Sequence, residues 1–179
     1  VGRLVEQKNQ KLLINAFSKI AKKYPEYKLK IFGEGNLREE LQKQIDDLNM
    51  KSKIHLCGVC DNIREQLEKA QIFVLPSNYE AMPNALIEAM ALGCSVISTD
   101  CPCGGPRELI KNNENGILVP VNNEQELCNK IEYLIRNEEK AKIMGENAKK
   151  IKEKLNPNNI LEQWENYIIK ILQKGRNIK

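Results

Sequence analysis

The chain alternates between two kinds of hydrophobic pattern. Short apolar stretches rich in β-branched residues predict strands, and they lie at residues 29–32, 54–56, 72–75, 96–97 and 117–119. Between them, apolar residues recur at intervals of three and four, which is the spacing of one face of a helix. These helical stretches are centred on residues 13–20, 37–48, 63–70, 86–90 and 127–135.

A strand followed by a helix, repeated along the chain, is typical of parallel strands joined by helical crossovers. Right-handed crossovers give an α/β fold with a doubly wound parallel sheet and helices on both faces. Residues 1–4 look like the end of a first strand that begins earlier. From about Asn123 onward the pattern is helical only, and Pro157 interrupts it. We therefore expect a Rossmann-like domain over residues 1–155 and a C-terminal helix over residues 156–179.

Composition narrows the class of protein. The 179 residues fit one domain, with 41% hydrophobic and 29% charged residues and a net charge of +4. The apolar runs are too short to span a membrane, and the basic residues are interspersed with acidic ones, which argues against nucleic acid as a partner. Six cysteines without a visible secretory segment predict reduced thiols in a cytoplasmic protein.

Ligands of a doubly wound sheet bind in the crevice at the carboxyl ends of its strands. Arg3 and Lys8 follow the first predicted strand, and their positive charges could neutralise a diphosphate there. Gly33 and Gly35 follow the next one, but Arg38 stands where a dinucleotide fingerprint needs its third glycine. A turn that requires positive φ is the better explanation of these glycines.

The densest group of candidate residues surrounds the helix predicted near residue 86. Pro83 suits the first turn of that helix, whose amides and dipole would bind a phosphate. Glu80 precedes the helix and Glu88 lies within it, and either carboxylate could accept two hydrogen bonds from a vicinal diol of a sugar or ribose. Most glutamates are solvated surface acids, but the location of these two beside an anion site favours a functional role.

At these residues the sequence resembles the carboxyl-terminal, donor-binding domain of glycosyl transferases group 1, retaining enzymes of the two-Rossmann (GT-B) fold. The matching motifs follow the family's order through nearly the whole chain: Gly2-Arg3-Leu4 with Lys8, Phe32-Gly-Glu-Gly35, Glu80-x(7)-Glu88 continuing to Gly93, Val96-Ile-Ser-Thr-Asp100 and Asn115-Gly-Ile-Leu-Val119. Each motif is weak alone, and together they are specific. Ser95 departs from the proline common in the family, which we interpret as a local difference in stability.

The resemblance implies a role for each matched position. Arg3 and Lys8 would grip the donor diphosphate, and Glu80 would sit beside the transferred sugar, which makes these three the expected catalytic residues. Glu88 would accept the ribose hydroxyls. The remaining positions of the implied donor site are Gly2, Gly33, Gly35, Gly58, Val59, Ala81, Met82, Pro83, Asn84 and Ala85. Among them, Gly58 and Val59 would lie near the base, and residues 81–85 would offer backbone amides.

The implied activity is transfer of a hexose or N-acetylhexosamine from a nucleoside-diphosphate sugar, with a UDP-sugar favoured, to a glycan or lipid-linked acceptor in polysaccharide biosynthesis. The acceptor would bind to an amino-terminal half of the enzyme. The last helix would either pack back on its own domain or cross to that half. The domain alone would be inactive. The intact enzyme could associate peripherally with the inner face of the membrane. No Asp-x-Asp pair occurs, so we expect a metal-independent site without a cofactor.

Three other interpretations stay open from the sequence. A nucleotide-sugar epimerase of similar build would need acid and base groups that His55, placed in the middle of a strand, supplies poorly. A non-catalytic nucleotide-sugar-binding module would bind without transfer. A zinc site is conceivable, because four cysteines fall at the carboxyl edge of the sheet: Cys57, Cys60, Cys101 and Cys103.

Overall fold

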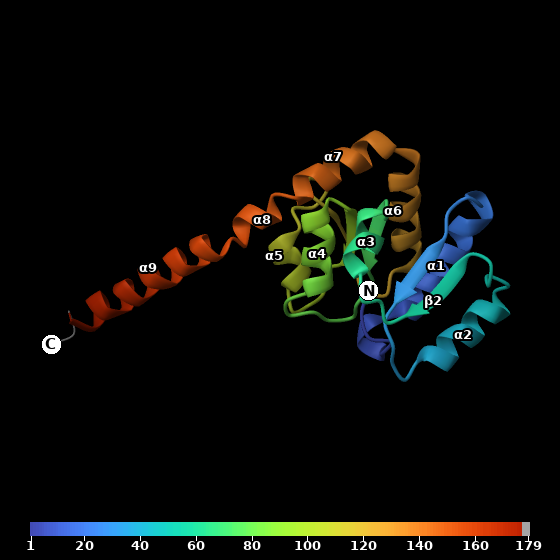
Figure 1. The fold of residues 1–179 in the computed structure, drawn as a ribbon, viewed down its shortest axis with the longest axis horizontal. Coiled ribbons are helices and arrows are strands. Elements are labelled where there is room, and N and C mark those ends of the chain that lie inside the picture. The colour runs from blue at the N-terminus through green and yellow to red at the C-terminus, as the bar shows by residue number, and fades with distance from the viewer. Residues whose placement is uncertain (177–179) are drawn as a thin grey trace. The chain divides into compact units, whose positions relative to one another are not determined.

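The structure is a computed structural model that describes residues 1–176. The chain forms two compact units, Val1–Lys149 and the residues from Lys150 onward. The break lies a few residues before the expected one at 155/156, and the last three residues of the expected segment 156–179 lie outside the described residues. Figure 1 shows the first unit as an alternation of helices and strands.

The predicted elements are present in the predicted order. The strands are β1 (Leu29–Phe32), β2 (Ile54–Gly58), β3 (Ile72–Leu75), β4 (Ser95–Thr99) and β5 (Ile117–Val119). The helices of the first unit are η1 (Glu6–Lys8), α1 (Gln10–Lys23), α2 (Arg38–Asp47), α3 (Ile63–Glu68), α4 (Asn84–Leu92), α5 (Gly105–Leu109), α6 (Glu124–Arg136) and α7 (Glu138–Ala148). Each crossover between successive strands carries a helix, as parallel pairing requires.

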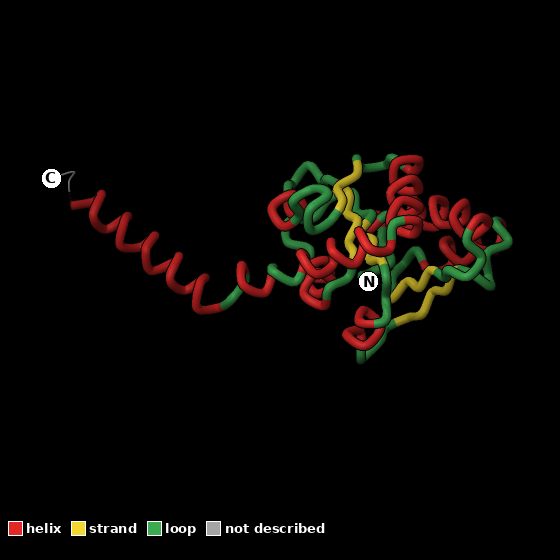
Figure 2. The backbone as a smooth tube through the Cα atoms, turned by 90° about the horizontal axis from the view of Figure 1, so that it is seen from above, coloured by secondary structure: helices red, strands yellow, loops and turns green. Residues whose placement is uncertain are grey.

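All strand pairs are parallel, which confirms the doubly wound α/β class, but the strands form two hydrogen-bonded sets. β1 pairs with β2, and β4 lies between β3 and β5. Figure 2 shows these two sets as separate yellow groups. A cavity of about 420 Å³ lies between the free edges of β1 and β3 and is lined by both. The two sets are therefore held together by the helices and not by a shared ladder.

The hydrophobic core explains how helices hold the two sets. α1 packs against α6, and Leu13, Phe17 and Ile131 all belong to one buried cluster that also contains Ile31 of β1 and Ile97 of β4. β4 is buried along its whole length. A strand covered on both faces is expected at the centre of a doubly wound sheet.

Residues 1–4 run alongside the end of β1, but none of them belongs to a strand, contrary to the expectation. The amide of Gly2 donates to the carbonyl of Phe32 (2.9 Å), and the amide of Leu4 donates to that of Glu34 (2.9 Å). Gly33 lies between these contacts with φ of 133°, and a Cβ built there would overlap the carbonyl of Gly2. Only glycine therefore allows the two backbones to approach so closely.

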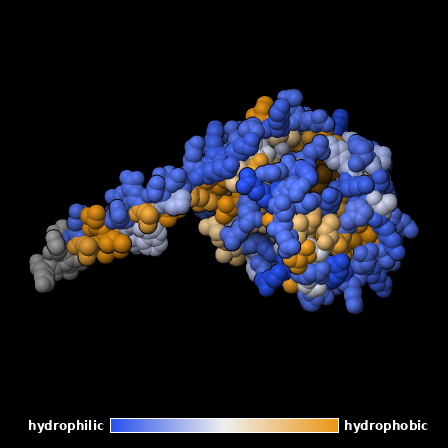
Figure 3. Space-filling model, in the orientation of Figure 1, coloured by the Kyte–Doolittle hydropathy of each residue, from blue (hydrophilic) through white to orange (hydrophobic). Residues whose placement is uncertain are grey.

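The second unit contains α8 (Ile151–Lys154) and α9 (Pro157–Arg176). Pro157 is the first residue of α9, where its missing N–H leaves no bond unmade, so it separates two helices as predicted. Apolar side chains of α9 are exposed, among them Leu161, Trp164 and Ile168, and Figure 3 shows orange surface along this helix. Docking of this helix stays a prediction. Among the described residues, no helix is both long and apolar enough to cross a membrane.

Candidate functional site

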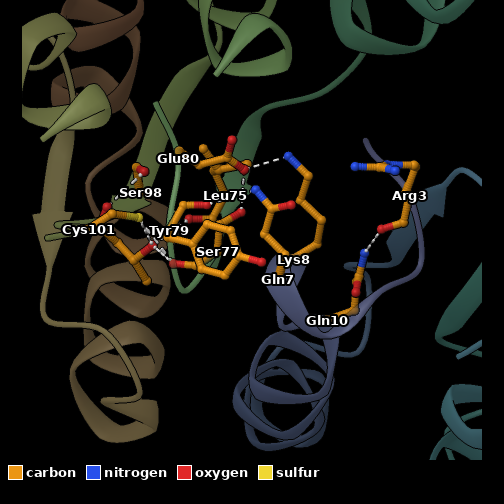
Figure 4. Close-up of polar contacts among 11 residues, drawn as sticks. Arg3, Gln7, Lys8, Gln10, Leu75, Ser77, Tyr79, Glu80, Ser98 and Cys101 are labelled. Atoms are coloured by element: carbon orange, nitrogen blue, oxygen red, sulfur yellow. Dashed lines mark hydrogen bonds and ion pairs between the residues drawn. The ribbon is translucent and has the colours of Figure 1, made fainter. Parts of the chain in front are cut away.

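The centre of the candidate site is an ion pair between Lys8 and Glu80. Lys8 ends η1, and Glu80 lies in the loop between β3 and α4, 72 residues further along the chain. The ammonium of Lys8 donates to Oε1 of Glu80. Glu80 is only 5% exposed, so it is not a solvated surface acid. Figure 4 shows the two charged groups facing each other. The structure thus joins two of the three expected catalytic residues.

Backbone and amide contacts hold η1 to the loop that carries Glu80. The amide of Asn78 donates to the carbonyl of Gln7 (2.8 Å), and the side-chain amide of Gln7 donates to the carbonyl of Tyr79 (3.0 Å). Asn78 also donates to the carbonyl of Glu6 (3.0 Å) through its side chain. These contacts fix the backbones on either side of the ion pair, so its geometry does not depend on two long side chains alone.

Arg3, the third expected catalytic residue, is exposed. Its backbone is fixed, because the side-chain amide of Gln10 donates to the carbonyl of Arg3 (2.8 Å). In the view of Figure 4, the guanidinium lies on the side of its loop that faces Lys8. Gln10 is buried, and its Oε1 is the one buried side-chain polar atom without a hydrogen bond in the described part of the chain.

The start of α4 offers backbone amides to the site. The helix begins at Asn84, with Pro83 as the N-cap residue, one position earlier than expected for this proline. Pro83 has no side chain that can cap the helix, and the first turn contains no acidic residue. An uncapped helix start leaves amides free to bind an anion. Ala81, Met82 and Asn84 are exposed there, and Ala85 is half-buried.

Glu88 differs from Glu80 in its surroundings. It lies in the second turn of α4 and is exposed. No ion pair of Glu88 is found among the described residues. Its expected contact with ribose hydroxyls stays a prediction.

The glycine-rich turns after β1 and β2 meet each other. The amide of Gly33 donates to the carbonyl of Gly58 (2.7 Å). A Cβ on Gly35 would overlap the backbone of Leu4, so residues 2–4 and the turns after β1 and β2 pack together as a backbone platform. Positive φ at Gly33 confirms the expected reason for that glycine, but the expectation is wrong for Gly35, which has no positive φ and is required by its close contact with Leu4. Val59, beside Gly58, is 75% exposed and free to contact a ligand.

The loop after β4 supports the Glu80 loop from its other side. A Cβ on Gly105, the first residue of α5, would overlap the backbone of Glu80 and Ala81. Arg107 donates two hydrogen bonds to Asp100 (2.9 and 2.5 Å), which ties α5 to the end of β4. Residues 103 and 104 lead the chain into α5, which begins at Gly105. Burial raises the pKa of the nearby Cys101 thiol.

The cysteines do not form the zinc site that their spacing allowed. Over residues 1–176, no three His, Cys, Asp or Glu side chains are grouped so that they could hold a metal ion. Cys57 is exposed, whereas Cys101 is buried and its thiol donates to the carbonyl of Ser77 (3.2 Å). Cys94 and Cys128 are buried thiols. His55 lies within β2, also as expected.

Two polar residues at the site received no role from the sequence. Ser77 and Thr99 are both fully buried, and the hydroxyl of Ser77 donates to Oε1 of Glu80 (2.7 Å). Thr99 in turn donates to the carbonyl of Ser77. Their positions in the sequence could have indicated a role at the site. Both lie at or just after the carboxyl end of a buried strand, and neighbouring parallel strands bring such residues together.

Comparison with known proteins agrees with this geometry. Residues 1–151 match the family model described as Glycosyl transferases group 1. An uncharacterized glycosyltransferase of Methanocaldococcus jannaschii is 44% identical over 62% of this chain and 27% of its own length. A second relative is 36% identical over 83% of this chain and 40% of its own length: the N-acetylgalactosamine-N,N'-diacetylbacillosaminyl-diphospho-undecaprenol 4-alpha-N-acetylgalactosaminyltransferase of Campylobacter jejuni.

Solved structures share the fold. The crystal structure of a mutant of TarM from S. aureus, in complex with UDP among other ligands, has a TM-score of 0.86 and 32% identity, and it covers 92% of this chain and 34% of that one. HepE of Anabaena in complex with UDP, with a TM-score of 0.86 and 23% identity over 94% of this chain and 47% of that one, agrees in fold. This chain spans less than half the length of each of these four proteins.

Proposed function

Because the chain belongs to the glycosyl transferases group 1, we propose that it is the donor-binding half of a retaining glycosyltransferase. The donor is a nucleoside-diphosphate sugar, and UDP is favoured because two similar structures are described as complexes with UDP. The acceptor is a glycan or a lipid-linked glycan, in keeping with the undecaprenol-linked substrate in the name of the Campylobacter relative. Acceptor binding falls to an amino-terminal half, without which this domain transfers nothing.

The observation that carries the proposal is the ion pair between Lys8 and the buried Glu80 beside the uncapped start of α4. Departure of a nucleoside diphosphate requires stabilisation of negative charge on the leaving phosphate. Arg3, Lys8 and the amides at the start of α4 are positive groups that can supply it without a metal ion or cofactor. One preorganised hydrogen-bond donor at such a site lowers the barrier by roughly 2.7–4 kcal/mol.

The role of Glu80 follows from the same pair. A carboxylate next to Lys8 stays beside the diphosphate and can accept hydrogen bonds from hydroxyls of the sugar attached to it. Gly58 and Val59 are assigned to the base, Glu88 to the ribose, and residues 81–85 to the sugar and phosphates. The family match favours transfer over epimerisation. We place the enzyme in the cytoplasm, at the inner face of the membrane when it acts on a lipid-linked acceptor.

Thermal unfolding with UDP, GDP and ADP tests the donor. We expect UDP to raise the unfolding temperature most, because binding to the native state at about a hundred times Kd adds about 2.7 kcal/mol of stability. Arg3→Ala should abolish most of this shift without lowering the unfolding temperature of the free protein. Arg136→Ala is the matched control, since it removes an exposed cation at the far end of α6. Equal shifts in both variants would remove Arg3 from the site.

A further inference from the structure

One buried group at the site has no role in the proposed function: the hydroxyl of Ser77. Ser77 lies two residues after β3, has no exposed surface and donates to Oε1 of Glu80 (2.7 Å). Most side-chain hydrogen bonds go to backbone or water. A bond from a buried hydroxyl to a carboxylate is stronger than a neutral one, so this contact restrains Glu80 strongly.

Both donors to Glu80 bind the same oxygen. Oε1 accepts from the hydroxyl of Ser77 and from the ammonium of Lys8. No hydrogen bond to Oε2 occurs within the described residues. A glutamate side chain otherwise has considerable rotamer freedom. Two donors on Oε1 remove that freedom and leave the lone pairs of Oε2 for a ligand.

Ser77 is itself held from β4. Its carbonyl accepts from the hydroxyl of Thr99, the last residue of β4, and from the thiol of Cys101 (3.2 Å). All three residues are buried. Figure 4 shows this chain of contacts running from Cys101 through Ser77 to Glu80. The orientation of the carboxylate is thus set by buried residues at the ends of two adjacent strands.

Lys8 shares its positive charge between Glu80 and the diphosphate when a donor is bound. An ammonium has three donors, and a diphosphate placed at Lys8 draws on the same positive charge. The hydroxyl of Ser77 is buried behind Glu80 and therefore stays with it.

We propose that Ser77 is a positioning residue that fixes Oε1 of Glu80, with Thr99 behind it, so that Oε2 faces the donor sugar during transfer. This inference rests on the proposed function. It concerns a residue that touches no substrate and acts only through Glu80. Removing its hydroxyl should therefore slow turnover and leave donor binding nearly unchanged.

Hydrolysis of the donor by the full-length enzyme tests it: the sugar passes to water and UDP leaves, and steady-state release of UDP is measured with UDP-glucose, UDP-N-acetylglucosamine and UDP-N-acetylgalactosamine as donors. Ser77→Ala should lower kcat about tenfold, equivalent to about 1.4 kcal/mol in the barrier, with the KM of the donor within about twofold of wild type. Ser98→Ala is the matched control, because Ser98 is also fully buried but donates to the backbone carbonyl of Thr99 (3.1 Å). It should keep the wild-type kcat.

A double-mutant cycle shows whether Ser77 acts through Glu80. Ser77→Ala combined with Glu80→Ala should be no slower than Glu80→Ala alone, and a further tenfold loss would overturn the inference. A kcat of Ser77→Ala equal to that of Ser98→Ala would overturn it while leaving the proposed function intact. Wild-type enzyme that releases UDP from none of the three donors would overturn both.

Folding is checked by circular dichroism. If Ser77→Ala does not fold, Ser77→Cys takes its place, because a thiol fills similar space but is a weaker donor. Its kcat should again fall with little change in KM. An unchanged kcat would overturn the inference.

Discussion

The two glutamates that flank the start of α4 illustrate what single residues contribute. Glu80 is buried and bound by Lys8 and Ser77, whereas Glu88 is exposed. Burying a carboxylate is unfavourable unless it is paired and hydrogen-bonded. The buried, charged form of Glu80 is therefore stable only together with its partners. Its ion pair supports the folded state as well as the geometry of the site.

Lys8→Met tests this coupling. The substitution should lower the free energy of unfolding by about 3 kcal/mol, the lower end for a broken buried pair, because the buried Glu80 loses its counter-charge. A further Glu80→Gln substitution in the same protein should restore part of the loss. Urea unfolding measures both. The coupling is refuted if Lys8→Met and the double variant are equally stable.

At the scale of elements, the turns after parallel strands build the site, and their backbones touch directly. The turn after β1 approaches residues 2–4 so closely that Gly33 and Gly35 have no space for a side chain. The start of α5 approaches the Glu80 loop in the same way at Gly105. These backbone contacts fix the position of each loop relative to its neighbours. They therefore also fix the backbone positions of Arg3 and Glu80.

Gly33→Ala and Gly104→Ala separate the effect of close contact from that of positive φ. Both glycines have positive φ, but a Cβ on Gly104 meets nothing within 4 Å. Gly104→Ala should cost only the conformational term, about 1–2 kcal/mol. Gly33→Ala should cost clearly more, because the backbone of Gly2 must move, and it should weaken UDP binding at Arg3. Similar losses of stability in the two variants would show that close contact is unimportant.

The sequence predicts the elements well, since all five strands and five amphipathic helices lie where their hydrophobic patterns place them. It also locates Lys8 and Glu80 at one edge. It does not reveal that they form an ion pair, because the pair joins residues 72 apart in the chain. The sequence also does not reveal the roles of Ser77 and Gln10. Ser77 donates to the carboxylate of Glu80 and Gln10 to the carbonyl of Arg3, and only the folded chain brings these groups together.

For the whole molecule, buried thiols make stability depend on pH in the alkaline range. Burial raises the pKa of Cys94 from 9.0 to about 11, and it raises the pKa of Cys101 and Cys128 in the same direction. Above pH 9 the unfolded chain releases these protons while the folded chain retains them. The folded state then binds more protons, so its stability falls as pH rises.

Urea unfolding between pH 8 and about pH 11 measures this dependence. The free energy of unfolding should be nearly constant up to about pH 9 and should then decline, with a shallower decline in Cys94→Ala. Cys57→Ala removes an exposed thiol and serves as the control, with the slope of wild type. A decline that Cys94→Ala leaves unchanged would assign the effect to other groups.

The central claim is that the diphosphate of a sugar nucleotide binds where Arg3, Lys8 and the start of α4 meet. A crystal structure of the protein soaked with UDP tests it most directly. We expect oxygens of the diphosphate at about 2.7–3.2 Å from the guanidinium of Arg3, the ammonium of Lys8 and backbone amides among residues 81, 82, 84 and 85. UDP bound at another edge of the sheet, or bound here with both cations directed away from its phosphates, would contradict the account.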